Sequence, residues 1–386
     1  MNRKSPLLTL VQESTSIKRK RGTLYTPEEI LNQCCIWNNT AEYIVSKHSY
    51  LRNILNKKSN NLILTGTGSS YYVCKALEWT LRNHINGRVI TAPATDIVTH
   101  SNHLFPSDID GLMVHFSRSG NTPESVHTVN VMRRDYPRLF HIVVTCNQNS
   151  AIVKQFSKKH NVLILPLSKQ TCDMGLAMTT SVSNMFIAGA FFNFINNPGR
   201  YISSVHQLSQ AGIKILDKSA GLAKQLGLKK FRRVILLGTG RLHTTAMEGA
   251  LKITELTDGE IATMAETFLG VRHGPITFVD ERTLVIYLIS PDSKVQNYEM
   301  DLIRQLHKKG LGMCRVALTS SSNKAISRYA DYVVNLGSYN YEMAFPIYLL
   351  FLQMYGLFSS LAHGLKPDNP SRRNVITRVV KGVKIY

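Results

Sequence analysis

Hydrophobic residues in the first half of the chain fall into short apolar runs, separated by segments in which apolar residues recur with a helical period. Apolar runs that alternate with helices are typical of a parallel sheet covered on both faces. Five runs are interpreted as strands, namely Leu62–Leu64, Arg88–Ala92, Leu112–Phe116, Ile142–Cys146 and Val162–Leu167. An apolar helix near 179–194 closes this half. The pattern predicts an α/β protein.

The second half of the chain repeats the first at a nearly constant offset. Val234–Gly240 reproduces Leu62–Gly68, and Leu284–Ile289 reproduces Leu112–Ser117, both 172 residues later. Two further apolar runs, Arg315–Leu318 and Tyr332–Leu336, follow at offsets near 170. Residues 343–361 close the second copy as residues 179–194 close the first. A repeat of this length predicts that one α/β unit has been duplicated.

The N-terminal region differs from both repeats. Residues 1–22 show no convincing periodicity and are predicted to be a loose arm. Thr26 is a candidate N-cap, followed by Pro27 at the first helical position and Glu29 at the third, so a helix is expected from there through Trp37. A further helical segment is expected near 40–57. The predicted domains are residues 1–50, an arm and a helix, followed by α/β units at 51–215 and 216–386.

The charge balance narrows the choice of ligand. The 386 residues contain 46 Lys and Arg against 25 Asp and Glu, a formal charge of +21. Such a charge suits nucleic acid or a membrane surface, but the only dense basic run is Lys18–Arg21 and no nucleic-acid-binding module is present. The scattered charges are therefore interpreted mainly as a solvated surface that favours anionic ligands in general, and neither nucleic acid nor a membrane is expected as partner.

Cysteine usage and hydropathy favour the cytoplasm. The six cysteines form no C-x-x-C pair and no metal-ligand spacing with histidine, so no metal or other cofactor is expected. The N-terminus lacks the apolar core of a secretory signal. Residues 343–361 are nearly long enough to span a bilayer, but Pro346, Gln353 and Gly356 interrupt them, which favours a buried core or interface helix.

A candidate anion site follows the third predicted strand. Leu112–Phe116 ends in the hydroxyl- and glycine-containing segment 117–122, and Pro123 opens a helix. Unpaired N–H groups at the positive end of a helix attract phosphate, and hydroxyls can add donors. An ordinary N-capped turn fits the same residues, so this loop alone leaves both interpretations open.

The second copy lacks this loop and carries acid and base groups instead. Glu248–Leu256 places Lys252 and Glu255 on one helix, and Val271–Pro275 contains His273. One half is thus predicted to bind the anion and the other to supply proton transfer. A solvated Lys–Glu pair and a loop histidine bonded to backbone are the alternatives.

Several ordered motifs in residues 24–386 resemble those of the sugar isomerase (SIS) family. They are G-T-G-S-S at 66–70, T-D-I-V-T at 95–99, S-R-S-G-N-T-P-E-S at 117–125, G-L-A-M-T at 175–179, E-G-A-L-K-I-T-E-L at 248–256 and R-H-G-P at 272–275. The nearest branch is that of the bacterial tagatose-6-phosphate ketose/aldose isomerases and galactosamine-6-phosphate deaminases. The resemblance implies two tandem flavodoxin-like SIS units, each a parallel sheet with helices on both faces.

The resemblance also implies roles for individual residues. The sugar phosphate would be bound by Ser69, Ser70, Ser117, Arg118, Ser119, Thr122 and Thr179. Glu255 would move a proton between C2 and C1, and Lys252 would hold the substrate or tune Glu255. His273 would assist ring opening from a neighbouring subunit, so a homodimer or homotetramer is expected. Arg378 would take the place of a lysine that related isomerases carry in the tail.

The implied reaction converts galactosamine-6-phosphate to tagatose-6-phosphate and ammonia without a cofactor. The chain departs from the branch at Cys172 and Met174, where histidine and arginine are usual around Asp173, at Ile276, and in the C-terminal tail. These departures leave the galacto or gluco configuration of the sugar open. A phosphosugar-binding regulator without catalysis is the alternative.

Overall fold

The structure is a computed structural model that describes residues 5–58, 60–83, 85, 87–320, 324–380 and 382–386. The chain forms two compact units. The β1–β5 unit comprises Cys35–Asp173, Met178–His206 and Ile376–Tyr386. The β6–β10 unit comprises the N-terminal residues to Cys34, Met174–Ala177 and Gln207–Val375. Each unit is described by itself.

Five parallel strands form the sheet of the β1–β5 unit, in the order β2-β1-β3-β4-β5. Their bounds are β1 Asn61–Gly66, β2 Arg88–Pro93, β3 Gly111–Ser117, β4 Leu139–Thr145 and β5 Val162–Pro166. This order is that of the flavodoxin-like sheets, in which ligands bind at the switch point between β1 and β3. The predicted strands and the predicted fold class are confirmed.

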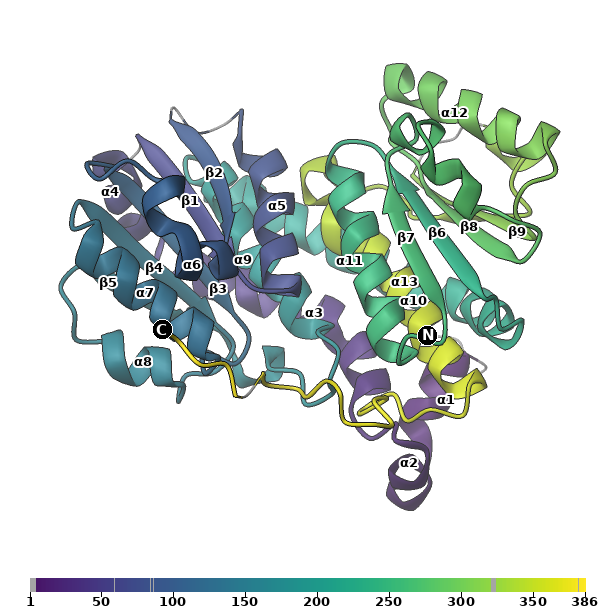
Figure 1. Ribbon diagram of the computed structural model, residues 1–386, viewed down its shortest axis with the longest axis horizontal. Helices are drawn as coiled ribbons and strands as arrows, with labels where there is room; N and C mark the ends of the chain where they lie inside the picture. The colour runs from purple at the N-terminus through teal and green to yellow at the C-terminus, as the bar shows by residue number, and fades with distance from the viewer. Residues whose placement is uncertain (1–4, 59, 84, 86, 321–323, 381) are drawn as a thin grey trace. The chain divides into compact units, whose positions relative to one another are not determined.

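Helices cover both faces of this sheet (Figure 1). They are α4 His48–Lys57, α5 Ser69–Leu81, α6 Ala94–Leu104, α7 Pro123–Asp135, α8 Ala151–Phe156 and α9 Thr180–Ala190, with short 3-10 turns at Lys169–Thr171 and Phe191–Phe194. Ile97 of α6 and Met132 of α7 pack on Ile63 of β1 in one core cluster. On the opposite face, Gly189 of α9 approaches Phe116 so closely that a Cβ would lie 2.9 Å from the ring.

The β6–β10 unit repeats this topology. Its strands are β6 Arg233–Gly238, β7 Ala262–Glu266, β8 Thr283–Leu288, β9 Cys314–Thr319 and β10 Tyr332–Asn335, in the order β10-β9-β8-β6-β7. Read from β7, this is the order of the first sheet, so the predicted duplication is confirmed. The sequence pattern did not indicate β7, because this edge strand alternates small and polar residues and none of its side chains is fully buried.

The helices of the second unit are α11 Arg241–Leu256, α12 Ser293–Lys308 and α13 Ala344–Ala362, while α10 Pro198–Leu228 passes from one unit to the other. Short 3-10 turns lie at Gly270–Arg272, Pro275–Phe278, Ile326–Arg328 and Tyr341–Met343. The segment Tyr341–Ala362 is apolar and long enough for a membrane span, but 94% of its most apolar window is buried in the protein. The prediction of a core helix is confirmed.

The prediction that residues 1–22 form a loose arm is wrong for residues 5–22, while residues 1–4 lie outside the described residues. Helices α1 Pro6–Gln12 and α2 Thr15–Arg21 precede α3 Thr26–Val45, which begins at the predicted residue. Leu7 and Leu10 are buried, although the two helices are too short to show a clear period. The Ser14 side chain caps α2, and Gly22 ends it with φ +65°. Tertiary burial therefore orders a segment whose local pattern is weak.

Candidate functional site

The predicted anion loop connects β3 to α7 and is shaped by its own hydroxyls. Gly120 N donates to Ser117 Oγ at 3.1 Å, and Asn121 N donates to Ser119 Oγ at 3.2 Å. Gly120 has φ +59°, and a Cβ at this position would lie 2.4 Å from Ser150 Oγ. Two of the four predicted loop contacts with phosphate, Ser117 and Ser119, thus also fix the backbone of the loop.

Two helix N-termini meet this edge of the sheet, and among the described residues neither has a side-chain cap. Thr122 precedes α7, where its hydroxyl donates to Ser125 Oγ at 2.6 Å instead of capping the helix. Gly68 precedes α5, whose first residues are the buried Ser69 and Ser70. Because β1 and β3 are neighbours in the sheet, the N–H groups of both helices are placed at its switch point. Such a pair of positive termini favours a dianion.

Arg118 places a guanidinium beside the loop. Its side chain is largely buried, and one nitrogen donates to the backbone carbonyl of Arg378 in the C-terminal tail. Arg378 in turn donates from Nε to the Asp173 carbonyl at 2.6 Å and lies 3.2 Å from Cys172 Sγ. The structure therefore brings together the predicted residues Arg118 and Arg378.

Asp173 organises the segment that carries Thr179. Its buried carboxylate accepts hydrogen bonds from the Thr179 N–H and hydroxyl and from the N–H groups of Thr180 and Ser181. It therefore caps α9, and the Thr179 hydroxyl donates to Asp173 at 2.9 Å. Sequence reasoning gave Asp173 no role, because it lies six residues before Thr179 and only the folded segment brings its carboxylate to the start of α9.

On α11, Lys252 lies between two carboxylates. Its Nζ bonds Glu255 Oε2 and lies 3.4 Å from Glu248 Oε1. The side chains of Lys252 and Glu248 are fully buried, whereas that of Glu255 is 23% exposed. The alternative of a solvated surface pair is thus wrong for Lys252. The buried Lys252 side chain thus lies between two carboxylates and orients the one that reaches solvent.

Glu248 is the third member of this group and was not proposed as a site residue from the sequence. Positions 248, 252 and 255 are spaced by four and three residues, which places their side chains on one face of a helix. That spacing was visible in the sequence. The burial of two of the three side chains was not, because it arises where α11 packs on α13.

His273 lies in a different part of the same unit. It follows the 3-10 turn Gly270–Arg272 and precedes Gly274, whose φ is +120°. The imidazole is exposed, while the neighbouring Arg272 donates to Gln305 Oε1 at 2.9 Å. No bond joins His273 to the Lys252 group within the described residues, so its catalytic role stays a prediction.

The loop after β8, which corresponds to the anion loop, is already occupied by carboxylates. The Asp292 side chain accepts from the N–H groups of Lys294 and Val295 and so caps α12. Glu299 Oε2 accepts from Ser290 N at 3.0 Å. Burial raises the pKa of Glu299 to about 7. The N–H groups of Lys294 and Val295 at the start of α12 are thus hydrogen-bonded within this unit.

Within the described part of the chain, no cluster of three or more His, Cys, Asp or Glu side chains is arranged to hold a metal ion.

Comparison with known proteins shows which family and which relatives the chain resembles. Residues 54–193 and 227–361 match the model of the SIS domain. The D-galactosamine-6-phosphate deaminase AgaS of Escherichia coli O157:H7 is 31% identical over 370 residues, which cover 94% of this chain and 95% of that protein. The glutamine–fructose-6-phosphate aminotransferase of Pyrobaculum aerophilum is 24% identical over 81% of this chain and 50% of that protein.

Solved structures agree. The tagatose-6-phosphate ketose/aldose isomerase of Escherichia coli is similar with a TM-score of 0.84 and 27% identity, over 94% of this chain and 96% of that chain. A Clostridium novyi protein, solved as a candidate tagatose-6-phosphate ketose/aldose isomerase, reaches a TM-score of 0.92 at 30% identity, with 98% of both chains covered.

Proposed function

The chain belongs to the SIS family, and from this premise we propose that it converts galactosamine-6-phosphate to tagatose-6-phosphate and ammonia. The similarity to a D-galactosamine-6-phosphate deaminase over 94% of the chain supports this choice of substrate. The observation that carries the proposal is the buried Lys252, which holds the partly exposed Glu255 on α11. A carboxylate held in this way suits proton abstraction next to a carbonyl.

The phosphate of the substrate binds at the switch point of the β1–β5 unit. The N-termini of α5 and α7 supply N–H groups, and Ser69, Ser70, Ser117, Ser119 and Thr122 supply hydroxyls. Arg118 adds a positive charge next to these donors. Thr179 is retained as a candidate, but its hydroxyl would have to leave Asp173 to reach a ligand.

Proton transfer then proceeds on the open-chain sugar. Glu255 removes the proton from C2 of the aldehyde while O1 takes up a proton, which gives an enolamine. Glu255 then returns its proton to C1 while the amine nitrogen releases one. The product is a ketimine at C2, and one water molecule hydrolyses it to the ketose phosphate and ammonia. With a hydroxyl at C2, the same proton transfer gives aldose–ketose isomerisation alone.

Lys252 and Glu248 keep Glu255 ready for this step. The ion pair with Lys252 fixes the orientation of Glu255, while Glu248 keeps the Lys252 ammonium in place. His273 assists ring opening from a neighbouring subunit of a homodimer or homotetramer, and its exposure is compatible with such a contact. Arg378 lies against the anion loop through Arg118 and acts on the sugar. The reaction takes place in the cytoplasm and, because water cleaves the ketimine, is a hydrolysis.

The test is ammonia release from galactosamine-6-phosphate and glucosamine-6-phosphate. Wild-type protein should release ammonia from the galacto sugar, and Glu255→Gln should lower kcat by about 10³-fold, within the range for loss of a general base. Its affinity for inorganic phosphate should not change, because the phosphate donors lie in the other unit. Glu260→Gln, an exposed residue of the same unit, is the matched control and should keep full activity.

Two results would contradict the proposal. Failure of the wild-type protein to release ammonia from either sugar, with sugar phosphates still bound, would favour a regulator that binds phosphosugars without converting them. Full activity of Glu255→Gln would remove Glu255 as the base while leaving the substrate assignment in place.

A further inference from the structure

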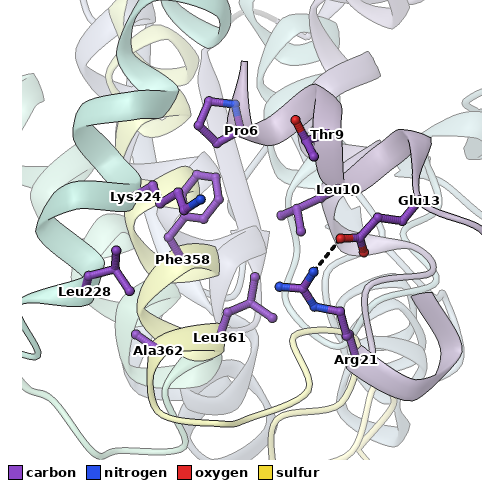
Figure 2. Close-up of a pocket in the computed structure, with 10 residues that line it drawn as sticks. All are labelled: Pro6, Thr9, Leu10, Glu13, Arg21, Lys224, Leu228, Phe358, Leu361 and Ala362. Atoms are coloured by element: carbon purple, nitrogen blue, oxygen red, sulfur yellow. Dashed lines mark hydrogen bonds and ion pairs between the residues drawn. The ribbon is translucent and has the colours of Figure 1, made fainter. Parts of the chain in front are cut away.

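A cavity of about 290 Å³ lies in the β6–β10 unit, between the N-terminal helices and the two long helices α10 and α13 (Figure 2). Its walls come from four helices and the link between α1 and α2. The lining residues are Pro6, Thr9, Leu10, Glu13, Arg21, Lys224, Leu228, Phe358, Leu361 and Ala362. None of them belongs to the residues proposed above to bind or convert the sugar phosphate.

Most of the lining is apolar, but it also includes two cationic side chains. Figure 2 shows Arg21 and Lys224 reaching the cavity from α2 and α10. One nitrogen of Arg21 pairs with Glu13 Oε1, which among the described residues leaves most of the five N–H donors of the guanidinium for another acceptor. The ammonium of Lys224 adds a second positive charge to the lining. With Glu13 counted, the lining carries one net positive charge.

The size of the cavity limits the ligand. A cavity of about 150 Å³ admits benzene, whereas pockets for drug-sized molecules begin near about 300 Å³. A volume of about 290 Å³ therefore suits a small organic molecule with a single apolar group. A free phosphate ion would gain nothing from Leu10, Phe358 and Leu361.

We propose that this cavity is a binding site for a small amphipathic carboxylate, such as a medium-chain alkanoate. Its apolar body lies on Leu10, Phe358 and Leu361, and its carboxylate is bound by Arg21 and Lys224. Arg21 offers the planar donor pair that a carboxylate prefers. Glu13 holds Arg21 in place. Its negative charge leaves the lining with one net positive charge, which matches the single negative charge of a carboxylate.

The site is connected to the catalytic helix through α13. Leu361 and Phe358 line the cavity, and the preceding turns of α13 pack directly on α11. A Cβ on Gly249 of α11 would lie 2.3 Å from Leu352 Cδ1, and one on Gly356 of α13 would lie 2.8 Å from Leu256 Cδ1. These contacts leave no slack between the helices, so a ligand that shifts α13 also shifts the helix that carries Lys252 and Glu255.

Calorimetric titration of the full-length protein with butyrate, hexanoate and octanoate tests the site. Each added methylene should tighten binding about fourfold while the cavity fills, and the gain should then level off. Hexanol, which lacks the charge, should bind about tenfold more weakly than hexanoate. Hexylamine should bind more weakly still, because Arg21 and Lys224 repel it.

Three variants separate the site from the protein surface. Lys224→Ala should weaken hexanoate about tenfold and leave hexanol unchanged. Ala362→Phe should fill the cavity and abolish binding of both. Lys218→Ala is the matched control, since Lys218 is an exposed lysine of α10 that does not line the cavity, and binding should be unchanged.

The proposal is overturned if no alkanoate binds saturably at millimolar concentration. It is also overturned if affinity rises with chain length without levelling off and equally for alcohol and acid, which is the behaviour of non-specific surface binding. Equal effects of Lys224→Ala and Lys218→Ala would contradict it as well. Each result is a direct binding measurement, so it is independent of whether the protein deaminates galactosamine-6-phosphate.

Discussion

The loops after β3 and β8 occupy the same place in the two units. They differ in whether a protein side chain caps the N–H groups of the helix that follows. The helix after β3 begins at Thr122, whose side chain makes no capping bond with the described residues, and its loop turns through Gly120 with φ +59°. The helix after β8 begins at Asp292, whose carboxylate takes up two N–H groups, while Glu299 takes up the N–H of Ser290. The start of α12 is thus capped by a carboxylate of the protein, whereas the start of α7, proposed above to bind phosphate, has no such cap among the described residues.

Under the proposed function, this difference lets the two copies of a duplicated unit take different parts in one reaction. A helix N-terminus that is filled by protein carboxylates gives stability but cannot bind phosphate. The β6–β10 unit has Asp292 and Glu299 at this loop and carries Glu248, Lys252 and Glu255 on the helix after its glycine turn. The helix in the same position of the first unit, α5, presents Ser69 and Ser70 instead.

Gly120→Ala should have the largest effect, because it changes the loop after β3. The new Cβ would lie 2.4 Å from Ser150 Oγ, and φ is +59°, so the loop must move. We expect loss of detectable phosphate binding in a titration with inorganic phosphate. Gly310→Ala is the matched control, because its φ is +64° and a Cβ added there would have no described neighbour within 4 Å. Normal phosphate affinity in Gly120→Ala would show that the loop is not the anion site.

Acid should destabilise the β1–β5 unit. His115 Nε2 lies 3.0 Å from His141 Nδ1, and both rings are buried in strands β3 and β4. Burial lowers the pKa of His141 to about 3 and that of His115 well below its usual value. The unfolded chain binds these protons below about pH 6.5 and the folded chain does not, so stability falls as pH falls through this window.

For His141 alone, the loss should approach about 5 kcal/mol by pH 3. Denaturant unfolding at a series of pH values measures it. His115→Tyr introduces the residue found at the corresponding position of β8, Tyr287, and should weaken the dependence on pH. The same slope in this variant and in the wild type would assign the acid sensitivity to other groups.

Glu299 should give the β6–β10 unit the opposite dependence on pH. Burial raises its pKa from 4.5 to about 7, so its contribution to stability is present below about pH 4.5 and is lost as pH rises through 7. Glu299→Gln keeps the acceptor for Ser290 N without the charge. At pH 8 the variant should be more stable than the wild type, by about 3 kcal/mol at most, with little difference at pH 4. Unfolding of both proteins at the two pH values decides this.

The smallest effect compares the two caps directly. Asp292→Ala removes a side chain that accepts two N–H groups of α12, and should lower the free energy of unfolding by about 1 kcal/mol. Thr122→Ala should cost less, because Thr122 makes no capping bond with the described residues and its hydroxyl only donates to Ser125. Denaturant unfolding without phosphate measures both. Equal losses would mean that Thr122 also caps its helix.

Much of this architecture was predictable because it depends on local chemistry. The strands and the repeat were visible as apolar runs, since strands buried on both faces are almost continuously hydrophobic. The loop after β3 was recognisable because Gly120 and several hydroxyl residues follow an apolar run and precede a helix start, a composition typical of turns. Edge strand β7 was not visible, because Ala262–Glu266 is half-covered and lacks an apolar run.

The sequence by itself determined the α/β class, the duplication and the position of the glycine- and hydroxyl-containing loop after β3, because these depend on periodicity and on residues close together in the chain. Only the tertiary structure decided that α1 and α2 are ordered, that Lys252 is buried between Glu248 and Glu255, and that Glu299 fills the second loop. The physical reason is burial. In a sequence, a lysine or glutamate is expected at the surface. Only the packing of distant segments, such as α13 on α11, excludes water from these side chains.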